Sequence, residues 1–241
     1  MAYSELFNKS RAVPTTQTYA EVKPLLTWVY AWMLIGLIVT TAVAAFTVSS
    51  PAMLEIRTNT GVVFGSFIVQ IALVVILGAL MQRLSPALAA LLFLAYAATL
   101  GFTLSLLFLV FDIGSLVAAF GTTAILFGVM SIVGFTTDVD LTRIGSLLVL
   151  GLVGVIIALV VNMFIGSSMI NFLLSIVGVL IFMGLTAYDT QNIKRMAAVP
   201  EVQADGSVAA KVAIFAALSL YLNFINIFLF LLRIMGGGSS D

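Results

Sequence analysis

The amino-acid sequence predicts an all-α protein with seven helices that cross a membrane. Hydrophobic residues make up 62% of the 241 residues, charged residues make up only 8%, and the mean hydropathy is +1.24. A water-soluble domain of this length could not cover so much apolar surface with so few charges. The apolar residues also fall in long uninterrupted runs of about 20 residues, the length that a helix needs to cross the hydrocarbon core.

Seven such runs follow one another along the chain, and we interpret each as one membrane-spanning helix. Four of the five prolines, Pro24, Pro51, Pro86 and Pro200, fall in connections or at helix starts, where a missing N–H group is tolerated. Residues 1–25 are polar and are expected to form a cytoplasmic N-terminal segment. Because the connections are short, residues 1–241 are expected to form a single membrane domain. The predicted spans are residues 26–48, 62–82, 87–111, 114–136, 145–165, 169–188 and 212–234.

The basic residues predict the orientation of these spans. If the N-terminus is cytoplasmic, the outer segments contain only Arg57 and Arg233, and all other basic residues are on the inner side. This asymmetry follows the positive-inside rule, so we expect the N-terminus inside and the C-terminus outside. The inner residues are Lys9, Arg11, Lys23, Arg83, Arg143, Lys194, Arg195 and Lys211.

The composition also excludes several classes of function. Ten basic and ten acidic residues cancel, and no basic stripe indicates a nucleic-acid partner. The chain has no histidine and no cysteine, which removes the usual zinc and haem ligands, thiol catalysis and disulfides. We therefore expect no cofactor and no enzymatic activity, and the lipid bilayer is the one partner that the composition requires.

Polar side chains inside the last span form a stripe. Ser219, Asn223 and Asn226 recur at i, i+4 and i+7, which places them on one face of a helix. Polar groups at membrane depth cost free energy unless they face protein or water. The stripe either joins helices by hydrogen bonds or lines a path or a gate, and its residues leave both interpretations open.

Asp189, in the stretch LTAYDTQNIKRM, follows the apolar part of the sixth span. It can be an interface residue beside Tyr188, with Lys194 and Arg195 serving as positive-inside markers. However, a carboxylate at a helix C-terminus opposes the helix dipole and is expected to have a compensating partner. Arg83, at the matching end of the second span, is that candidate. A charge-assisted pair would tie the second and sixth helices together, and its loss would let them separate.

Three stretches, YAATLGFTLS, GLTAYDTQNIKRM and ALSLYLNFINIFLFLLRIMG, resemble the Bax inhibitor-1 family, also called the transmembrane Bax inhibitor motif family, and its bacterial branch in particular. The resemblance implies seven helices with the last one central and the N-terminus in the cytoplasm. It also implies a pH-sensitive calcium leak in a cell inner membrane. Eukaryotic members suppress cell death, and some bacterial relatives modulate a membrane protease.

The resemblance further implies a pH sensor made of two aspartates, from helices six and seven, and an arginine from helix two. Asp189 and Arg83 match two of these positions, but Asn223 stands where the family usually has the second aspartate. Two carboxylates in contact cannot both ionise cheaply, so such a pair titrates as a coupled unit. An aspartate beside an asparagine lacks this repulsion. We therefore expect pH sensing to be weakened, with a nearly flat leak between about pH 6 and 8.

Calcium is expected as a permeant ion that contacts Asp189 weakly and transiently, because a tight calcium site needs several oxygen ligands. The gating and ion-path residues are then Asp189, Asn223, Arg83, Asn226 and Ser219. The alternative function is a non-conducting regulator that binds a membrane protease. An intramembrane aspartyl protease would need a second carboxylate opposite Asp189, which the last span lacks. A secondary transporter would need broken helices in matching halves, which are not evident.

Overall fold

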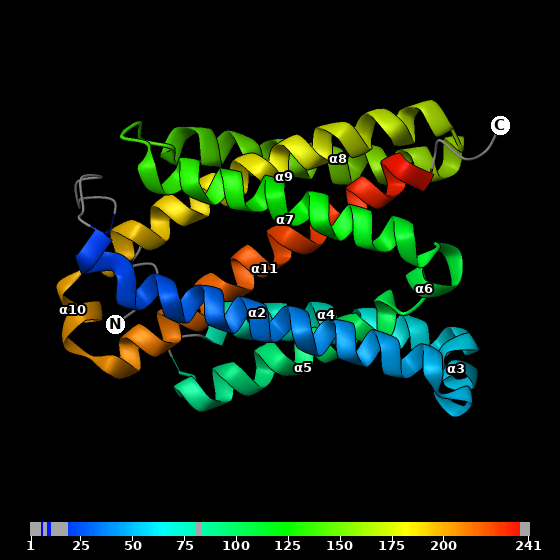
Figure 1. Ribbon diagram of the computed structural model, residues 1–241, viewed down its shortest axis with the longest axis horizontal. Helices are drawn as coiled ribbons and strands as arrows, with labels where there is room; N and C mark the ends of the chain where they lie inside the picture. Colours follow the sequence, from blue (N-terminus) through cyan, green and yellow to red (C-terminus); the bar gives the residue numbers. More distant parts are fainter. Residues whose placement is uncertain (1–5, 7–8, 11–18, 81–82, 237–241) are drawn as a thin grey trace. The chain divides into compact units, whose positions relative to one another are not determined.

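The structure is a computed structural model and describes residues 6, 9–10, 19–80 and 83–236. Within this part of the chain every regular element is a helix, and Figure 1 labels the helices in chain order. They are α2 (Tyr19–Ser49), α3 (Pro51–Thr58), α4 (Thr60–Leu80), α5 (Pro86–Leu104), α6 (Leu107–Val110), α7 (Ile113–Thr136), α8 (Thr142–Ile165), α9 (Ser168–Ala197), α10 (Pro200–Ala204) and α11 (Gly206–Gly236).

Among the described residues, seven stretches of helix are long and apolar enough to cross a membrane, and each overlaps one of the predicted spans. Helices α5 and α6 together make the third crossing, Pro86–Val110. The prediction of an all-α protein with seven membrane spans is confirmed. The second predicted span ends at residue 82, and its last two residues lie outside the described part of the chain.

The first membrane-spanning helix begins earlier in the chain than the composition predicts. Helix α2 begins at Tyr19, inside the stretch of residues 1–25 that was predicted to precede the first span. Residues 1–5, 7–8 and 11–18 of this stretch lie outside the described residues. The cytoplasmic location of the segment stays a prediction.

Prolines and one glycine mark where helices begin and end. Pro51, Pro86 and Pro200 each occupy the first turn of a helix, where the missing N–H group has no intrahelical partner to lose. The expectation for Pro24 was wrong, because it lies inside α2, six residues into the helix as described. Gly166 ends α8 with φ of 73°, a left-handed conformation that glycine adopts without steric cost.

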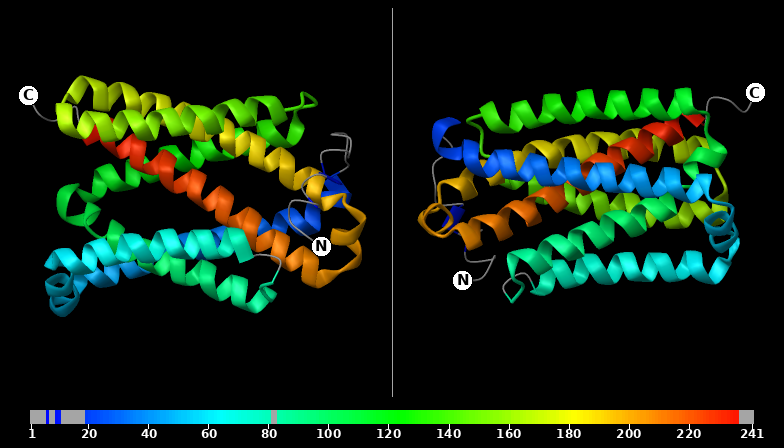
Figure 2. Two further views of the ribbon diagram at one scale, coloured as in Figure 1. Left: turned by 180° about the vertical axis from the view of Figure 1, so that it is seen from behind. Right: turned by 60° about the horizontal axis from the view of Figure 1, so that its bottom comes forward.

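The helices group into two compact units. The first unit contains Met1–Asp112 and Arg195–Tyr221, and Figure 2 shows its helix α5 running alongside both α2 and α4. The second unit contains Ile113–Lys194 and Leu222–Asp241, with α7, α8 and most of α9. Helix α11 supplies its first half to the first unit and its second half to the second. The prediction of a single membrane domain stays a prediction.

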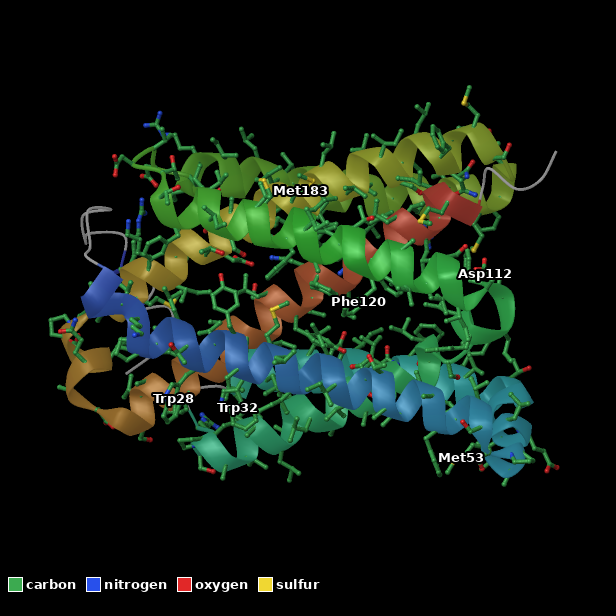
Figure 3. All side chains as sticks on the ribbon, in the orientation of Figure 1. Trp28, Trp32, Met53, Asp112, Phe120 and Met183 are labelled. Atoms are coloured by element: carbon green, nitrogen blue, oxygen red, sulfur yellow. The ribbon has the colours of Figure 1, made fainter. Side chains whose placement is uncertain are left out.

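The second unit has a core formed by α8, α9 and α11. Figure 3 labels Met183 of α9, which packs against this core, and Phe120 of α7, whose ring centroid lies 5.2 Å from that of Phe224 on α11. Aromatic pairs with this edge-to-face geometry add to the free energy gained by burying their area. The buried residues of the core are Val155, Val179, Ile181, Phe182, Leu185, Ile227 and Phe230.

The spans differ in how much protein covers them. Only 11% of the most apolar window is buried in α4 and in α8, against 61% in α11. The large apolar side chains that α4 and α8 leave exposed are in place for contact with lipid. Helix α11 has 31 residues and is about 46 Å long at the usual rise, so it exceeds the roughly 30 Å hydrocarbon core.

Candidate functional site

A hydrogen bond joins Asp189 of α9 to Asn223 of α11. The Asn223 side-chain Nδ2 donates to the Asp189 carboxylate Oδ2 at 2.8 Å. Asn223 is buried, with 5% of its surface exposed, and Asp189 is half-buried. Both residues belong to the second unit. A short bond from an amide to a carboxylate is stronger than a bond between two neutral groups, because the acceptor carries a charge.

Asp189 does not lie at a helix end. The sixth span was predicted to finish at Tyr188, but α9 continues to Ala197, about two turns beyond Asp189. The expectation that the helix C-terminus disfavours this carboxylate was therefore wrong. The helix outlasts the apolar run because the polar side chains after Asp189 are buried against protein. Every residue from Thr190 to Ala197 is buried.

Close packing holds α9 at the two residues before Asp189. A Cβ atom added to Gly134 of α7 would lie 2.1 Å from the carbonyl oxygen of Ala187. One added to Gly145 of α8 would lie 2.4 Å from the ring of Tyr188. Real Cβ atoms do not approach this closely, so these positions accept only glycine at the present spacing of the helices.

Two residues that follow Asp189 in α9 also hold this helix in place, and the sequence analysis did not identify this role. Gln191 and Lys194 are buried, with 1% and 5% of their surfaces exposed, and both bond to the chain where α7 ends and α8 begins. Lys194 was interpreted as a positive-inside marker at the membrane surface. In the structure its ammonium group is enclosed by protein. No pattern in the sequence identifies either residue, because the burial of a polar side chain shows only in the structure.

The other predicted site residues lie in different surroundings. Arg83 is exposed, in the turn between α4 and α5, and belongs to the first unit, so its pairing with Asp189 stays a prediction. Asn226 is half-buried and donates to the Leu222 carbonyl of its own helix at 2.8 Å. Ser219 is half-buried in the part of α11 that belongs to the first unit.

A second polar contact of α11 was also missed. The Tyr221 hydroxyl and the Thr40 hydroxyl of α2 are 2.6 Å apart, and both residues are buried in the first unit. Thr40 also lies within bonding distance of the carbonyls of Gly36 and Ala97, at 2.9 and 3.0 Å. Because a threonine hydroxyl has one proton, donation to either carbonyl leaves Tyr221 as the donor to Thr40.

Two buried hydroxyl groups of the second unit stand out. In the described part of the chain, neither Ser131 Oγ on α7 nor Thr190 Oγ1 on α9 has a hydrogen-bond partner. A buried hydroxyl without a partner costs about 1–3 kcal/mol, and ordered water commonly satisfies such groups. Thr190 directly follows Asp189 in α9.

The acidic residues do not form a metal cluster within the described residues. No three aspartate or glutamate side chains there gather closely enough to hold a metal ion. A calcium contact at this site would use Asp189 with amide, hydroxyl or backbone oxygens, which is a weak donor set for a hard cation. The predicted role of Asp189 as a transient calcium ligand stays a prediction.

The part of the chain that the structure describes has seven apolar helices, with a hydrogen-bonded acid where two of them meet, and these features define a polytopic integral membrane protein of the all-α class. The family model described as "Inhibitor of apoptosis-promoting Bax1" matches residues 22–240. The chain therefore belongs to the Bax inhibitor-1 family, as the three sequence stretches indicated.

Curated relatives match over almost their whole length. The chain is 40% identical over 227 residues to "Inner membrane protein YbhL" of Escherichia coli (strain K12), which covers 94% of this chain and 97% of the relative. It is 44% identical over 215 residues to an uncharacterized protein of Borreliella burgdorferi, covering 88% and 91%. A further uncharacterized protein, of Deinococcus radiodurans, is 37% identical over 230 residues, covering 95% and 96%.

Proposed function

We propose that the protein is a calcium-permeable leak channel of an inner membrane, gated by Asp189 and only weakly sensitive to pH. The observation that carries this proposal is the 2.8 Å bond from Asn223 to Asp189, a polar contact between two membrane-spanning helices. Ionisable groups within spans are rare and usually mark a pathway or a switch. Family membership supports the class of integral membrane protein, and the similarity to an inner membrane protein of Escherichia coli supports the location.

The gating step is the pairing of Asp189 with Arg83. Asn223 supplies one neutral donor to the carboxylate, and a carboxylate has further acceptor sites for a guanidinium group. When Arg83 pairs with Asp189, the second and sixth spans are tied together and the path is closed. When the pair breaks, the spans separate and calcium leaks. Arg83 is exposed in a turn, where its long side chain has the freedom to exchange partners.

The weak pH dependence follows from the amide at position 223. In a pair of aspartates, repulsion between the two carboxylates makes the pair take up a proton near neutral pH. Asn223 donates to the Asp189 carboxylate and carries no charge, so this source of proton uptake is removed. The charge that attracts Arg83 then persists over the physiological pH range.

Calcium passes this site without binding tightly. Within the described residues no cluster of three acidic side chains is present, and conduction requires weak binding so that ions can leave. The buried hydroxyl of Thr190, next to Asp189, has no partner in the described part of the chain and is a further oxygen that water or a passing cation could contact.

The test is calcium entry into liposomes that contain only the purified protein, measured as a function of pH. The unmodified protein should leak calcium at a rate that is nearly independent of pH. Arg83→Ala should raise the leak several-fold, because the closing pair is lost. Asn223→Asp should introduce a steep pH dependence, with the leak rising on acidification as protonation weakens the attraction for Arg83.

Asn162→Asp is the matched control, because it puts the same carboxylate in place of a buried asparagine of a membrane-spanning helix, α8, whose side chain donates to the nearby Ser167 carbonyl. Its leak should stay nearly flat with pH. A steep pH dependence of the unmodified chain that Asp189→Asn abolishes would contradict the role given to Asn223. If no variant leaks and the protein co-purifies with a membrane protease, the non-conducting regulator replaces the channel.

A further inference from the structure

Gln191 of α9 bonds to the backbone of the connection between α7 and α8. Its Oε1 accepts from the Leu141 N–H at 2.9 Å, and its Nε2 donates to the Val139 carbonyl at 2.8 Å. A longer contact, 3.5 Å, joins the same nitrogen to the Thr137 carbonyl. One side chain thus satisfies both a donor and an acceptor of a segment that has no regular structure of its own. Such buried bonds are costly to lose, because their partners are left unsatisfied.

Lys194, one turn further along α9, bonds to the end of α7. Its Nζ donates to the Phe135 carbonyl at 3.0 Å and lies 5.0 Å from the centre of the Phe135 ring. The last carbonyls of a helix lack intrahelical partners, and its C-terminus carries partial negative charge that favours a cation. The aromatic ring adds a cation–π attraction. Lys194 therefore caps α7.

These contacts lie on both sides of Asp189 along α9. Ala187 and Tyr188, just before it, are packed against Gly134 and Gly145. Gln191 and Lys194, just after it, hold the α7–α8 connection. All of these residues belong to the second unit, as does Asn223. The position of the carboxylate along and around α9 is thus set by its neighbours as well as by its own bond.

We infer that Gln191 and Lys194 are positioning residues that hold α9 so that the Asp189 carboxylate meets Asn223. The effect on calcium flux rests on the proposed function, but the effect on the Asn223 bond does not. Without the two side chains, the part of α9 after Tyr188 can shift against α7 and α8. The Asn223 bond is then made only part of the time, and Arg83 has a less well placed partner.

The first experiment compares Gln191→Met with Gln70→Met in nanodiscs. Both substitutions remove a buried glutamine that bonds to a neighbouring segment, since Gln70 of α4 donates to Thr99 and Thr103. The readout is the NMR signal of the Asn223 side-chain amide, assigned by its loss in Asn223→Asp. Gln191→Met should move this signal toward that of a solvent-exposed asparagine, and Gln70→Met should leave it in place. Calcium leak should rise several-fold in Gln191→Met only.

The second experiment uses Gln191→Glu, which makes the contact depend on pH. In its protonated form the introduced carboxyl can accept from Leu141 and donate to Val139, as glutamine does. In its ionised form it faces carbonyl oxygens and cannot donate. The Asn223 signal should therefore be normal at low pH and shifted at high pH, and the leak should rise on alkalinisation. This is opposite in sign to the pH dependence expected for Asn223→Asp.

Charged groups near this contact set where the transition falls. On the connection and the start of α8 they are Asp138, Asp140 and Arg143, all exposed, and on α9 they are Asp189, two residues before Gln191, and Lys194, one turn after it. The Asp140 carboxylate accepts from the backbone N–H and the hydroxyl of Thr142. The pH scan of Gln191→Glu therefore covers the whole range in which the variant stays folded, monitored by circular dichroism.

The outcomes separate the two proposals. An unchanged Asn223 signal in folded Gln191→Met, or equal shifts in Gln191→Met and Gln70→Met, would overturn the positioning role. A selective shift without any calcium leak in any variant would keep the positioning role and remove the channel. Lys194→Arg should retain the cap and the normal signal, whereas Lys194→Met should shift it. If these two variants gave the same Asn223 signal, the positioning role of Lys194 would be rejected.

Discussion

Helix α11 makes two buried polar contacts only two residues apart, and they differ in kind. In the first unit, Tyr221 meets Thr40 through two neutral hydroxyl groups. In the second unit, Asn223 meets Asp189 through an amide and an ionisable carboxyl group. The first contact has the same charge at every pH that the membrane meets, whereas the second can gain a proton or attract a cation.

The surroundings follow this division. Tyr221 is fully buried, and its ring makes edge-on contacts with Phe93 and Tyr96 at centroid distances of 5.7 and 6.1 Å. Asp189, by contrast, is half-buried and followed by a hydroxyl, that of Thr190, which has no partner in the described part of the chain. A packed neutral contact stabilises a helix in one place. A less enclosed contact of an ionisable group permits a change of partner, as the gate proposed above requires.

The largest expected effect comes from removing the aromatic ring of the neutral contact. Tyr221→Ala should lower the free energy of unfolding by about 3–5 kcal/mol, the usual cost of deleting a buried aromatic side chain. Tyr221→Phe keeps the ring and removes only the hydroxyl group, so it should cost about 0.5–1.5 kcal/mol. Unfolding in detergent micelles measures both. A comparable loss in the two variants would mean that the hydroxyl pair, rather than the ring, dominates.

The next largest effect is expected from disturbing the packing of α7 against α9, beside the Asn223–Asp189 contact. Gly134→Ala places a methyl group against the Ala187 carbonyl, so α7 and α9 must move apart. The expected loss is about 1–3 kcal/mol, as for other overpacked positions. Gly128→Ala, on the same helix with open space around its Cβ position, should change stability by less than about 0.5 kcal/mol. The Asn223 amide signal should shift only in Gly134→Ala.

A smaller difference concerns the coupling energies of the two contacts. Near neutral pH, a double-mutant cycle on Tyr221→Phe with Thr40→Val should give about 0.6 kcal/mol, and one on Asn223→Ala with Asp189→Ala should give about twice that value, because its acceptor is charged. The first value should not vary with pH. The second should fall as acid protonates Asp189, because the amide then donates to a neutral group. Two flat profiles would remove the distinction between the contacts.

The smallest effect is expected at an ion pair outside both contacts. Lys9 donates to Glu201 of α10, and this bond lowers the pKa of the Glu201 carboxyl from its ordinary value of 4.5. The pair therefore stabilises the folded chain above that pH, and its contribution is lost as the pH falls through the lowered pKa. Both side chains are partly exposed, so the contribution is slight. Glu201→Gln should flatten the acid end of the stability profile without changing the leak.

Hydropathy was sufficient to predict the seven spans, because the need to satisfy backbone groups in lipid leaves few alternatives to helices. It placed the end of the sixth span at Tyr188, nine residues before α9 ends at Ala197. Polar side chains after Tyr188 end an apolar run but do not end a helix when tertiary partners bury them. Those partners belong to α7 and α8, and no local pattern in the sequence reveals them.

The candidate site was predictable in part. The resemblance paired Asp189 with position 223, and the structure places the amide of Asn223 on that carboxylate. Gln191, Lys194 and the Thr40 contact of Tyr221 escaped notice, since a single polar residue in a sequence carries no sign of what lies opposite. Their importance became visible only with distances and burial.

The division of α11 between the two units has a consequence for how the chain is made. The first unit needs residues 195–221 to be complete, yet the rest of it, residues 1–112, is synthesised well before them. During translation, helices α2 to α6 therefore lack their contacts with α11 until that helix is inserted into the bilayer. Assembly of both halves is thus coupled to the synthesis of α11, and a chain stopped before this helix would leave neither half finished.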